Sequence, residues 1–288
     1  MFAEVISIRT RGIPLDGLFY QPPGAAAPHA AMLMHGNGMN FYSGAPRFLP
    51  SHLLARGIAS LASNRHGHDT VSSSTRSPEG NAFQTVDESI DDNEHAARYL
   101  AERGYPAPIV VGHSNGGLLA ARHAVNHRET PALVLLSAHC GGPQMLRRAS
   151  SHGLLAGDRL AEISAHAHQF VESGDGEQLL VLPGWFYVTT AASFVDMETN
   201  TPVLLDAAAA IACPVLFLRG DEEDPSLYPA EAFAEAAPGP VDVRIIKNCN
   251  HFYQGCEDEV GELIGEWLEA LNLPLPPQTP AYQSWPAI

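Results

Sequence analysis

One stretch of the chain combines a short apolar run, a serine framed by two glycines, and a second apolar run. Residues 109–111 predict a buried strand, whereas residues 118–124 predict a helix. Ser114 stands between them, with Gly112 and Gly116 two positions away on either side. Because a strand that turns sharply into a helix crowds its own backbone, both positions need a residue without a Cβ atom. The pattern therefore predicts that Ser114 lies on a strained strand-to-helix turn, above a helix N-terminus that favours negative charge.

Strand-like and helix-like segments alternate along most of the chain. After an opening antiparallel pair at 5–9 and 15–20, apolar strands are predicted at 30–34, 58–62, 109–113, 132–136, 214–218 and 241–246. Helices are predicted at 46–56, 85–103, 118–124, 229–237 and 258–271. This alternation is typical of an α/β protein with a mainly parallel sheet covered by helices.

Residues 139–213 interrupt the alternation with helical periodicity and aromatic clusters, so we expect a helical cap inserted into the core. The core domain is then made of residues 1–138 and 214–272. Residues 273–288 form a Pro-rich tail that is expected on the surface or against a neighbouring copy, which leaves a homo-oligomer open. The longest apolar stretch, 179–195, is interrupted by proline and glycine, so we expect it to be buried or pocket-lining and not to span a membrane.

Charge, the N-terminal residues and the cysteines limit which partners and which cellular compartment are expected. The chain of 288 residues has 16 Lys and Arg against 32 Asp and Glu, a formal net charge of -16. Such a charge repels polyanions and acidic membrane surfaces, so neither nucleic acid nor a membrane is expected as a partner. The N-terminus lacks the basic and apolar regions of a secretion signal, which predicts a cytoplasmic protein. The four cysteines lack Cys-x-x-Cys spacing, so free thiols are expected.

Polar motifs follow several of the predicted strands at their carboxyl ends. They are His35-Gly36, the Asn-Arg-His-Gly-His-Asp run at 64–69, the serine motif at 112–116, the acidic run at 220–225, and Asn250-His251-Phe252-Tyr253. In this combination the chain resembles the α/β-hydrolase fold family over about residues 5–271. The resemblance implies an α/β-hydrolase fold, with a mainly parallel central sheet flanked by helices and an inserted helical cap.

A serine hydroxyl is a weak nucleophile, so it needs a base that takes its proton and an acid that orients the base. The resemblance implies the chain order serine, acid, histidine. It assigns Ser114 as the nucleophile and His251 as the base, because His251 alone among 14 histidines follows the final strand. For the acid we take Asp224, on its Asp-Pro pair, with Glu223 as the alternative that the spacing from the strand-end glycine favours.

The resemblance also implies two backbone donors for the oxyanion of a tetrahedral intermediate. One is the residue after the nucleophile, Asn115, and the other comes from the loop after the third strand, where we expect Asn37. Within the cap, Met145, Trp185 and Phe186 are candidates to line a partly apolar substrate pocket.

Neither a cofactor nor a metal ion is expected. The chain has no glycine-rich phosphate loop and no dinucleotide fingerprint. Two His-x-His pairs, His66 with His68 and His166 with His168, lack acidic ligands at metal spacing. The first pair lies in 65–68, which resembles the structural Arg-x-Gly-His turn of the family.

These inferences predict a serine hydrolase that cleaves a carboxylic ester of a small to medium, partly apolar molecule through an acyl-enzyme on Ser114. A lactone or thioester substrate remains open, as do an acyltransferase and a carbon-carbon bond hydrolase, because a fold does not fix the reaction. A non-catalytic protein that binds small molecules is the alternative of another class.

Overall fold

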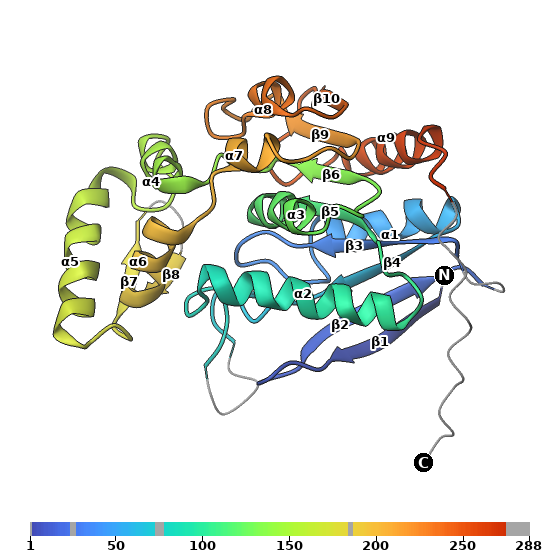
Figure 1. The fold of residues 1–288 in the computed structure, drawn as a ribbon. Helices are drawn as coiled ribbons and strands as arrows, with labels where there is room; N and C mark the ends of the chain where they lie inside the picture. The colour runs from blue at the N-terminus through green and yellow to red at the C-terminus, as the bar shows by residue number, and fades with distance from the viewer. Residues whose placement is uncertain (1, 24–26, 73–77, 184–186, 275–288) are drawn as a thin grey trace, which may run out of the picture.

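An eight-stranded sheet forms the centre of the computed structural model, which describes residues 2–23, 27–72, 78–183 and 187–274 (Figure 1). Its strands lie in the order β1 (Phe2–Ile8), β2 (Leu15–Gln21), β4 (Ile58–Ser63), β3 (His29–Met34), β5 (Ile109–His113), β6 (Leu133–Leu136), β9 (Val215–Gly220) and β10 (Val241–Ile246). The strands from β4 to β10 are parallel, whereas β1 and β2 pair antiparallel. The predicted mainly parallel sheet with an opening antiparallel pair is confirmed.

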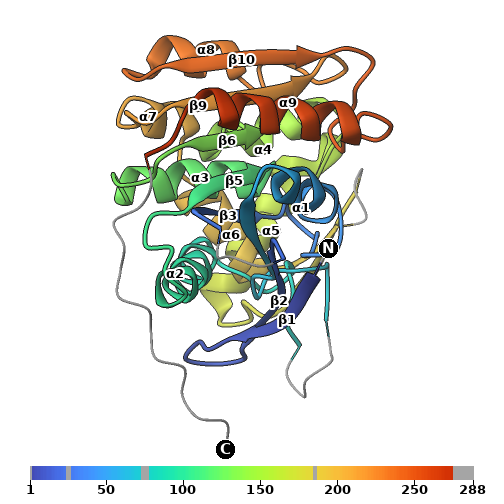
Figure 2. The same ribbon diagram turned by 90° about the vertical axis from the view of Figure 1, so that its right-hand side faces the viewer.

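Helices cover both faces of the sheet, because each buries one apolar side against it. One face carries α2 (Val86–Glu102), α3 (Asn115–Asn126), α7 (Leu204–Ala208) and α8 (Ala230–Ala236), which share one buried apolar cluster with the strands. The other carries α1 (Ala45–Ala55) and α9 (Glu257–Ala270), which share a second cluster. Figure 2 shows the sheet between these layers, with β10 at the top and β1 at the bottom. In α9, Ile264 and Leu268 are four residues apart and both are buried.

The segment between β6 and β9 lies mostly beyond one end of the sheet (Figure 1). We call residues 139–213 the insertion. It contains α4 (Gly142–Ser151), a 3-10 turn (Gly157–Arg159), α5 (Leu160–Ser173), β7 (Leu179–Leu182), β8 (Tyr187–Thr190), α6 (Ala191–Asn200) and α7. Its helices α4, α5 and α6 share a third apolar cluster, while α7 packs into the core beside α3.

One expectation for the insertion holds only in part. The apolar stretch at 179–195 is expected to be buried or pocket-lining, and Thr189, Ala191 and Phe194 are buried, but the stretch begins with a two-stranded antiparallel hairpin, β7 with β8. Leu179 is 46% exposed and Val181 is 69% exposed, whereas Leu182 is buried. A strand sends successive side chains to opposite faces, so a continuous apolar run on a two-stranded hairpin leaves part of its side chains uncovered.

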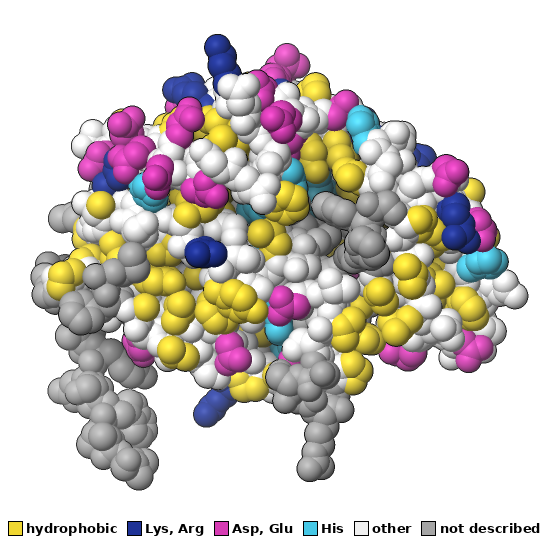
Figure 3. Space-filling model, turned by 180° about the vertical axis from the view of Figure 1, so that it is seen from behind, with side chains coloured by type: hydrophobic (Ala, Val, Ile, Leu, Met, Phe, Trp, Pro, Cys, Tyr) yellow, Lys and Arg dark blue, Asp and Glu magenta, His cyan; other side chains and the backbone are white. Residues whose placement is uncertain are grey.

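The surface carries many acidic side chains, as the negative net charge predicts. From behind, acidic side chains are spread over the molecule and hydrophobic ones gather in places, including the side of the insertion (Figure 3). Within the described ranges, no helix combines the length and the apolar character needed to cross a bilayer.

Candidate active site

Ser114 lies at the sharp turn that the sequence predicts. β5 ends at His113 and α3 begins at Asn115, so the serine alone connects strand to helix. Its backbone has φ 56° and ψ −120°, a strained conformation for a residue with a Cβ atom. A Cβ on Gly112 would overlap the Gly116 carbonyl, and one on Gly116 would overlap the carbonyl of Met34. The two glycines therefore permit the close approach of helix and strand that this turn requires.

Ser114, His251 and Glu223 form one chain of hydrogen bonds. His251 Nε2 lies 3.0 Å from Ser114 Oγ, and His251 Nδ1 lies 2.7 Å from Glu223 Oε1. An ionised carboxylate only accepts, so the imidazole proton sits on Nδ1 and Nε2 is free to accept from the serine. The Glu223 side chain is 3% exposed, which strengthens its attraction for the imidazole. This arrangement can take a proton from Ser114 and stabilise the resulting imidazolium.

Asp224 does not take the place predicted for it, and that prediction is wrong. Its carboxylate lies 3.0 Å from His152 Nε2 and accepts a hydrogen bond from the Ser226 backbone N–H at 2.7 Å. The side chain is 38% exposed. Hydrogen bonds from Ser226, and then from His152, lower the pKa of Asp224 to about 2. The Asp224 side chain therefore contacts His152 and not His251, which Glu223 contacts.

Ser137, which the sequence analysis missed, helps to hold Glu223 in place. Glu223 Oε2 accepts from Ser137 Oγ at 2.6 Å and from the Gly220 backbone N–H at 2.8 Å. The Tyr253 hydroxyl lies 2.7 Å from Ser137 Oγ. Ser137 directly follows β6, at the carboxyl edge where parallel strands bring polar residues together. Its position directly after a predicted strand could have indicated Ser137. Tyr253 lies two residues after His251, in the motif at 250–253.

Two further histidines surround His251 without adding positive charge. His113 donates from Nε2 to the His251 carbonyl at 2.8 Å, and the two rings lie 4.8 Å apart. Burial, with a smaller effect of His251, lowers the pKa of His113 to about 3. His139 Nδ1 accepts from the Gly141 N–H at 3.1 Å, and burial lowers the pKa of His139 to about 4. Near neutral pH both rings are uncharged, so neither opposes a proton on His251.

A cavity of about 360 Å³ opens at Ser114 and His251. The predicted pocket residue Met145 lines it, whereas Trp185 and Phe186 lie outside the described residues. Its other apolar lining comes from the loop after β3, the insertion and the loops near His251, namely Met39, Ala149, Leu154, Leu155, Leu227 and Phe252. The cavity therefore combines a largely apolar lining with the polar groups of Ser114 and His251.

The structure places the two residues predicted for the oxyanion hole near the serine turn. Asn37 lines the cavity, and Asn115 is the first residue of α3. Among the described residues, no hydrogen bond occupies the backbone N–H of either one. Both donors are therefore free to serve a ligand oxygen, although their role in catalysis stays a prediction.

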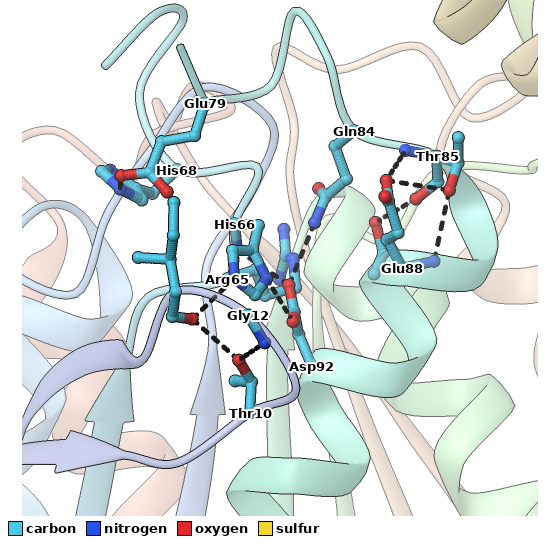
Figure 4. Close-up of polar contacts among 12 residues, drawn as sticks. Thr10, Gly12, Arg65, His66, His68, Glu79, Gln84, Thr85, Glu88 and Asp92 are labelled. Carbon is cyan, nitrogen blue, oxygen red and sulfur yellow. Dashed lines mark hydrogen bonds and ion pairs between the residues drawn. The ribbon is translucent and has the colours of Figure 1, made fainter. Parts of the chain in front are cut away.

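The histidines of the run at 64–69 have structural partners (Figure 4). His66 Nδ1 lies 2.7 Å from Asp92 Oδ1, and His66 Nε2 lies 2.8 Å from the Ile13 carbonyl. His68 instead faces Asp69 at 2.8 Å. A cavity of about 450 Å³ beside His66 is larger than the one at Ser114, but neither Ser114 nor His251 lines it. We therefore place the candidate site at the serine and not at the larger cavity.

The fold and the site agree with a comparison to protein families. The model of the alpha/beta hydrolase family matches residues 31–263. The chain belongs to this family. No curated protein matches the sequence of this α/β hydrolase.

Solved structures of other α/β hydrolases share its fold. Est1E from Butyrivibrio proteoclasticus with bound ferulic acid has a TM-score of 0.71 at 19% identity, over 93% of this chain and 99% of that one. The esterase domain of a Rhodothermus marinus protein has a TM-score of 0.65 at 20% identity, over 95% and 99%. A soluble variant of the Saccharomyces cerevisiae monoglyceride lipase has a TM-score of 0.68 at 13% identity, over 94% and 96%. At these identities the likeness establishes the fold and not a substrate.

Proposed function

We propose that this α/β hydrolase is a serine hydrolase that cleaves carboxylic esters of small to medium, partly apolar molecules. The observation that carries the proposal is the hydrogen-bonded chain from Ser114 Oγ through His251 to Glu223. Esterases among the fold neighbours support an ester as the substrate. The apolar lining of the 360 Å³ cavity supports the size and polarity of its acyl or alcohol part.

In the proposed reaction, Ser114 Oγ attacks the ester carbonyl while His251 Nε2 takes the serine proton. The carbonyl oxygen becomes an oxyanion, and the backbone N–H groups of Asn37 and Asn115 stabilise it. Collapse of the intermediate breaks the ester bond, and His251 gives its proton to the leaving alcohol. Water, activated by His251, then attacks the acyl-enzyme and releases the carboxylic acid. Glu223 keeps the Nδ1 proton in place throughout.

Labelling with a fluorophosphonate probe tests the proposal most directly. Wild type is expected to be labelled and to hydrolyse p-nitrophenyl esters, and Ser114→Ala is expected to lose both, because its side chain has no oxygen to attack. A series of acyl chains should show a maximum at the length that fills the cavity beside Met145. Unlabelled wild type that turns over no ester in the series would instead favour a non-catalytic binding protein.

Ser137→Ala is expected to lower kcat about tenfold with little change in KM, because one lost hydrogen bond to a charged group is worth about 1.5 kcal/mol. Ser137 does not touch the substrate cavity and acts as a positioning residue for Glu223. Ser60→Ala is the matched control, since Ser60 is equally buried and its hydroxyl has no hydrogen-bond partner among the described residues. Equal kcat for the two variants would show that the Ser137 contact is not needed.

A further inference from the structure

Two histidines and a glutamate meet on the face of the sheet that α2 and α3 cover. His123 lies in α3 and His127 directly follows it, so their spacing of four residues puts both rings on one side. Glu94 reaches them from α2, which lies beside α3 (Figure 1). Glu94 Oε2 is 2.8 Å from His127 Nε2, and Glu94 Oε1 is 3.3 Å from His123 Nδ1. One ligand atom from each residue lies within 4.8 Å of the others.

His123 brings a buried nitrogen that lacks a hydrogen bond. Its side chain is 3% exposed, and its ring stacks on that of His127 with centroids 4.1 Å apart. In the described part of the chain, Nδ1 of His123 has no hydrogen-bond partner, although the Glu94 carboxylate is close. Buried polar atoms are normally hydrogen-bonded, so this nitrogen, which faces only the Glu94 carboxylate at 3.3 Å, is available as a ligand atom.

His127 lies between two carboxylates. Its Nδ1 is 3.1 Å from Glu129 Oε1, while its Nε2 faces Glu94. A neutral imidazole has one N–H and can donate to only one of them. If Nδ1 donates to Glu129, the lone pair of Nε2 faces the Glu94 oxygens, and a cation between them would satisfy both. Metal-binding histidines usually donate the N–H of their other ring nitrogen to a carboxylate or carbonyl, as Nδ1 of His127 would to Glu129.

We propose that Glu94, His123 and His127 bind a divalent transition metal ion of the zinc class. Imidazole nitrogen with a carboxylate oxygen suits zinc, whereas calcium and magnesium prefer oxygen ligands alone. Ligand atoms around tetrahedral zinc lie about 3.3 Å apart. One atom from each of the three residues lies within 4.8 Å of the others, so the side chains would move slightly closer together around the ion. A cavity of about 240 Å³ lined by the three residues leaves room for water as a fourth ligand.

The ion would act on the scaffold and not on the ester. Ser114 caps the opposite end of α3, and a helix of 12 residues is about 18 Å long. Metal binding would instead join α2 to α3, the helix that carries the serine turn. The inference is therefore independent of the proposed function.

Calorimetric titration of the EDTA-treated full chain with ZnCl2 tests the site. Wild type is expected to bind one equivalent, and at 100 times Kd its Tm should rise by about 5 °C. Glu94→Gln and His127→Ala are expected to bind at least about 100-fold more weakly and to lose the Tm shift, because the first replaces an anionic carboxylate by a neutral amide and the second removes a ring nitrogen. Absorption of Co2+ as a zinc substitute should give visible bands of four-coordinate cobalt in wild type only.

Two controls separate this site from others. His168→Ala removes a comparable histidine next to a glutamate, since His168 Nε2 lies 2.9 Å from Glu198 Oε2, and it should bind zinc as wild type does. His251→Ala should also bind as wild type, which separates the site from zinc held at the serine. Circular dichroism identifies folded variants, and Glu94→Gln decides alone if His127→Ala does not fold. Absence of stoichiometric binding, or wild-type affinity in the folded variants, would make the cluster a hydrogen-bonded network only.

Discussion

Replacing Glu223 with glutamine is expected to lower kcat about 10⁴-fold, the size of effect that follows when the carboxylate of a serine triad becomes an amide. Glutamine keeps the shape of Glu223 but loses the negative charge that stabilises protonated His251. It can also present an N–H group to His251 Nδ1, now 2.7 Å from the carboxylate, and so favour the tautomer that cannot accept from Ser114. Hydrolysis of a p-nitrophenyl ester at saturating concentration measures the loss.

Asp224→Asn is the matched control, because it makes the same chemical change one residue away. Asp224 faces His152 and Ser226, so we expect its kcat to stay within about threefold of wild type. Glu223→Asp should fall between the two, since the shorter side chain keeps the charge but not the reach to His251. A larger loss in Asp224→Asn than in Glu223→Gln would reverse the assignment of the acid.

The identity of the triad acid could not be predicted from the sequence. Ser114 follows a continuous apolar strand and His251 follows the last predicted strand, so their places at the carboxyl edge could be predicted from local pattern. Residues 221–224 are four consecutive acids without periodicity, and no local rule selects among them. The choice depends on contacts from distant parts of the chain: Ser137 after β6 and His251 after β10 both bond to Glu223. The strand-end spacing from Gly220 was the better of the two signals.

The core of the fold could be predicted more fully than the insertion. Parallel strands buried on both faces give continuous apolar runs, and these mark β3, β5, β6 and β9 in the sequence. The hairpin of β7 and β8 gives a similar run but lies at the surface, so apolar content alone misjudged its burial. Likewise, the spacing of His123 and His127 is visible in the sequence, but Glu94 joins them only through the packing of α2 on α3.

Acid is expected to destabilise the protein well before most carboxylates titrate, because three buried histidines are held neutral. His35 donates from Nδ1 to the Gly36 carbonyl and accepts the Arg65 N–H at Nε2, so a second proton would break the latter bond. Burial is the main reason that the pKa of His35 lies well below its usual value and that of His139 lies at about 4. The third is His113, with a pKa of about 3. The unfolded chain takes up these protons near pH 6.5, so stability is present above that pH and is lost as pH falls toward 4.

Each such histidine should contribute a slope of about 1.4 kcal/mol per pH unit to the free energy of unfolding between pH 6 and pH 5. Urea unfolding of His139→Asn tests one of them, because asparagine can still accept the Gly141 N–H but cannot titrate. We expect its slope to be smaller than that of wild type by about that amount, whatever its stability at pH 7.5.

His152→Asn is the control with the opposite sign, since hydrogen bonds to the Arg148 carbonyl and to Asp224 raise the pKa of His152. Its removal should leave the slope unchanged or slightly steeper. An unchanged slope in His139→Asn would mean that His139 titrates alike in the folded and unfolded chain, and that its burial does not hold it neutral.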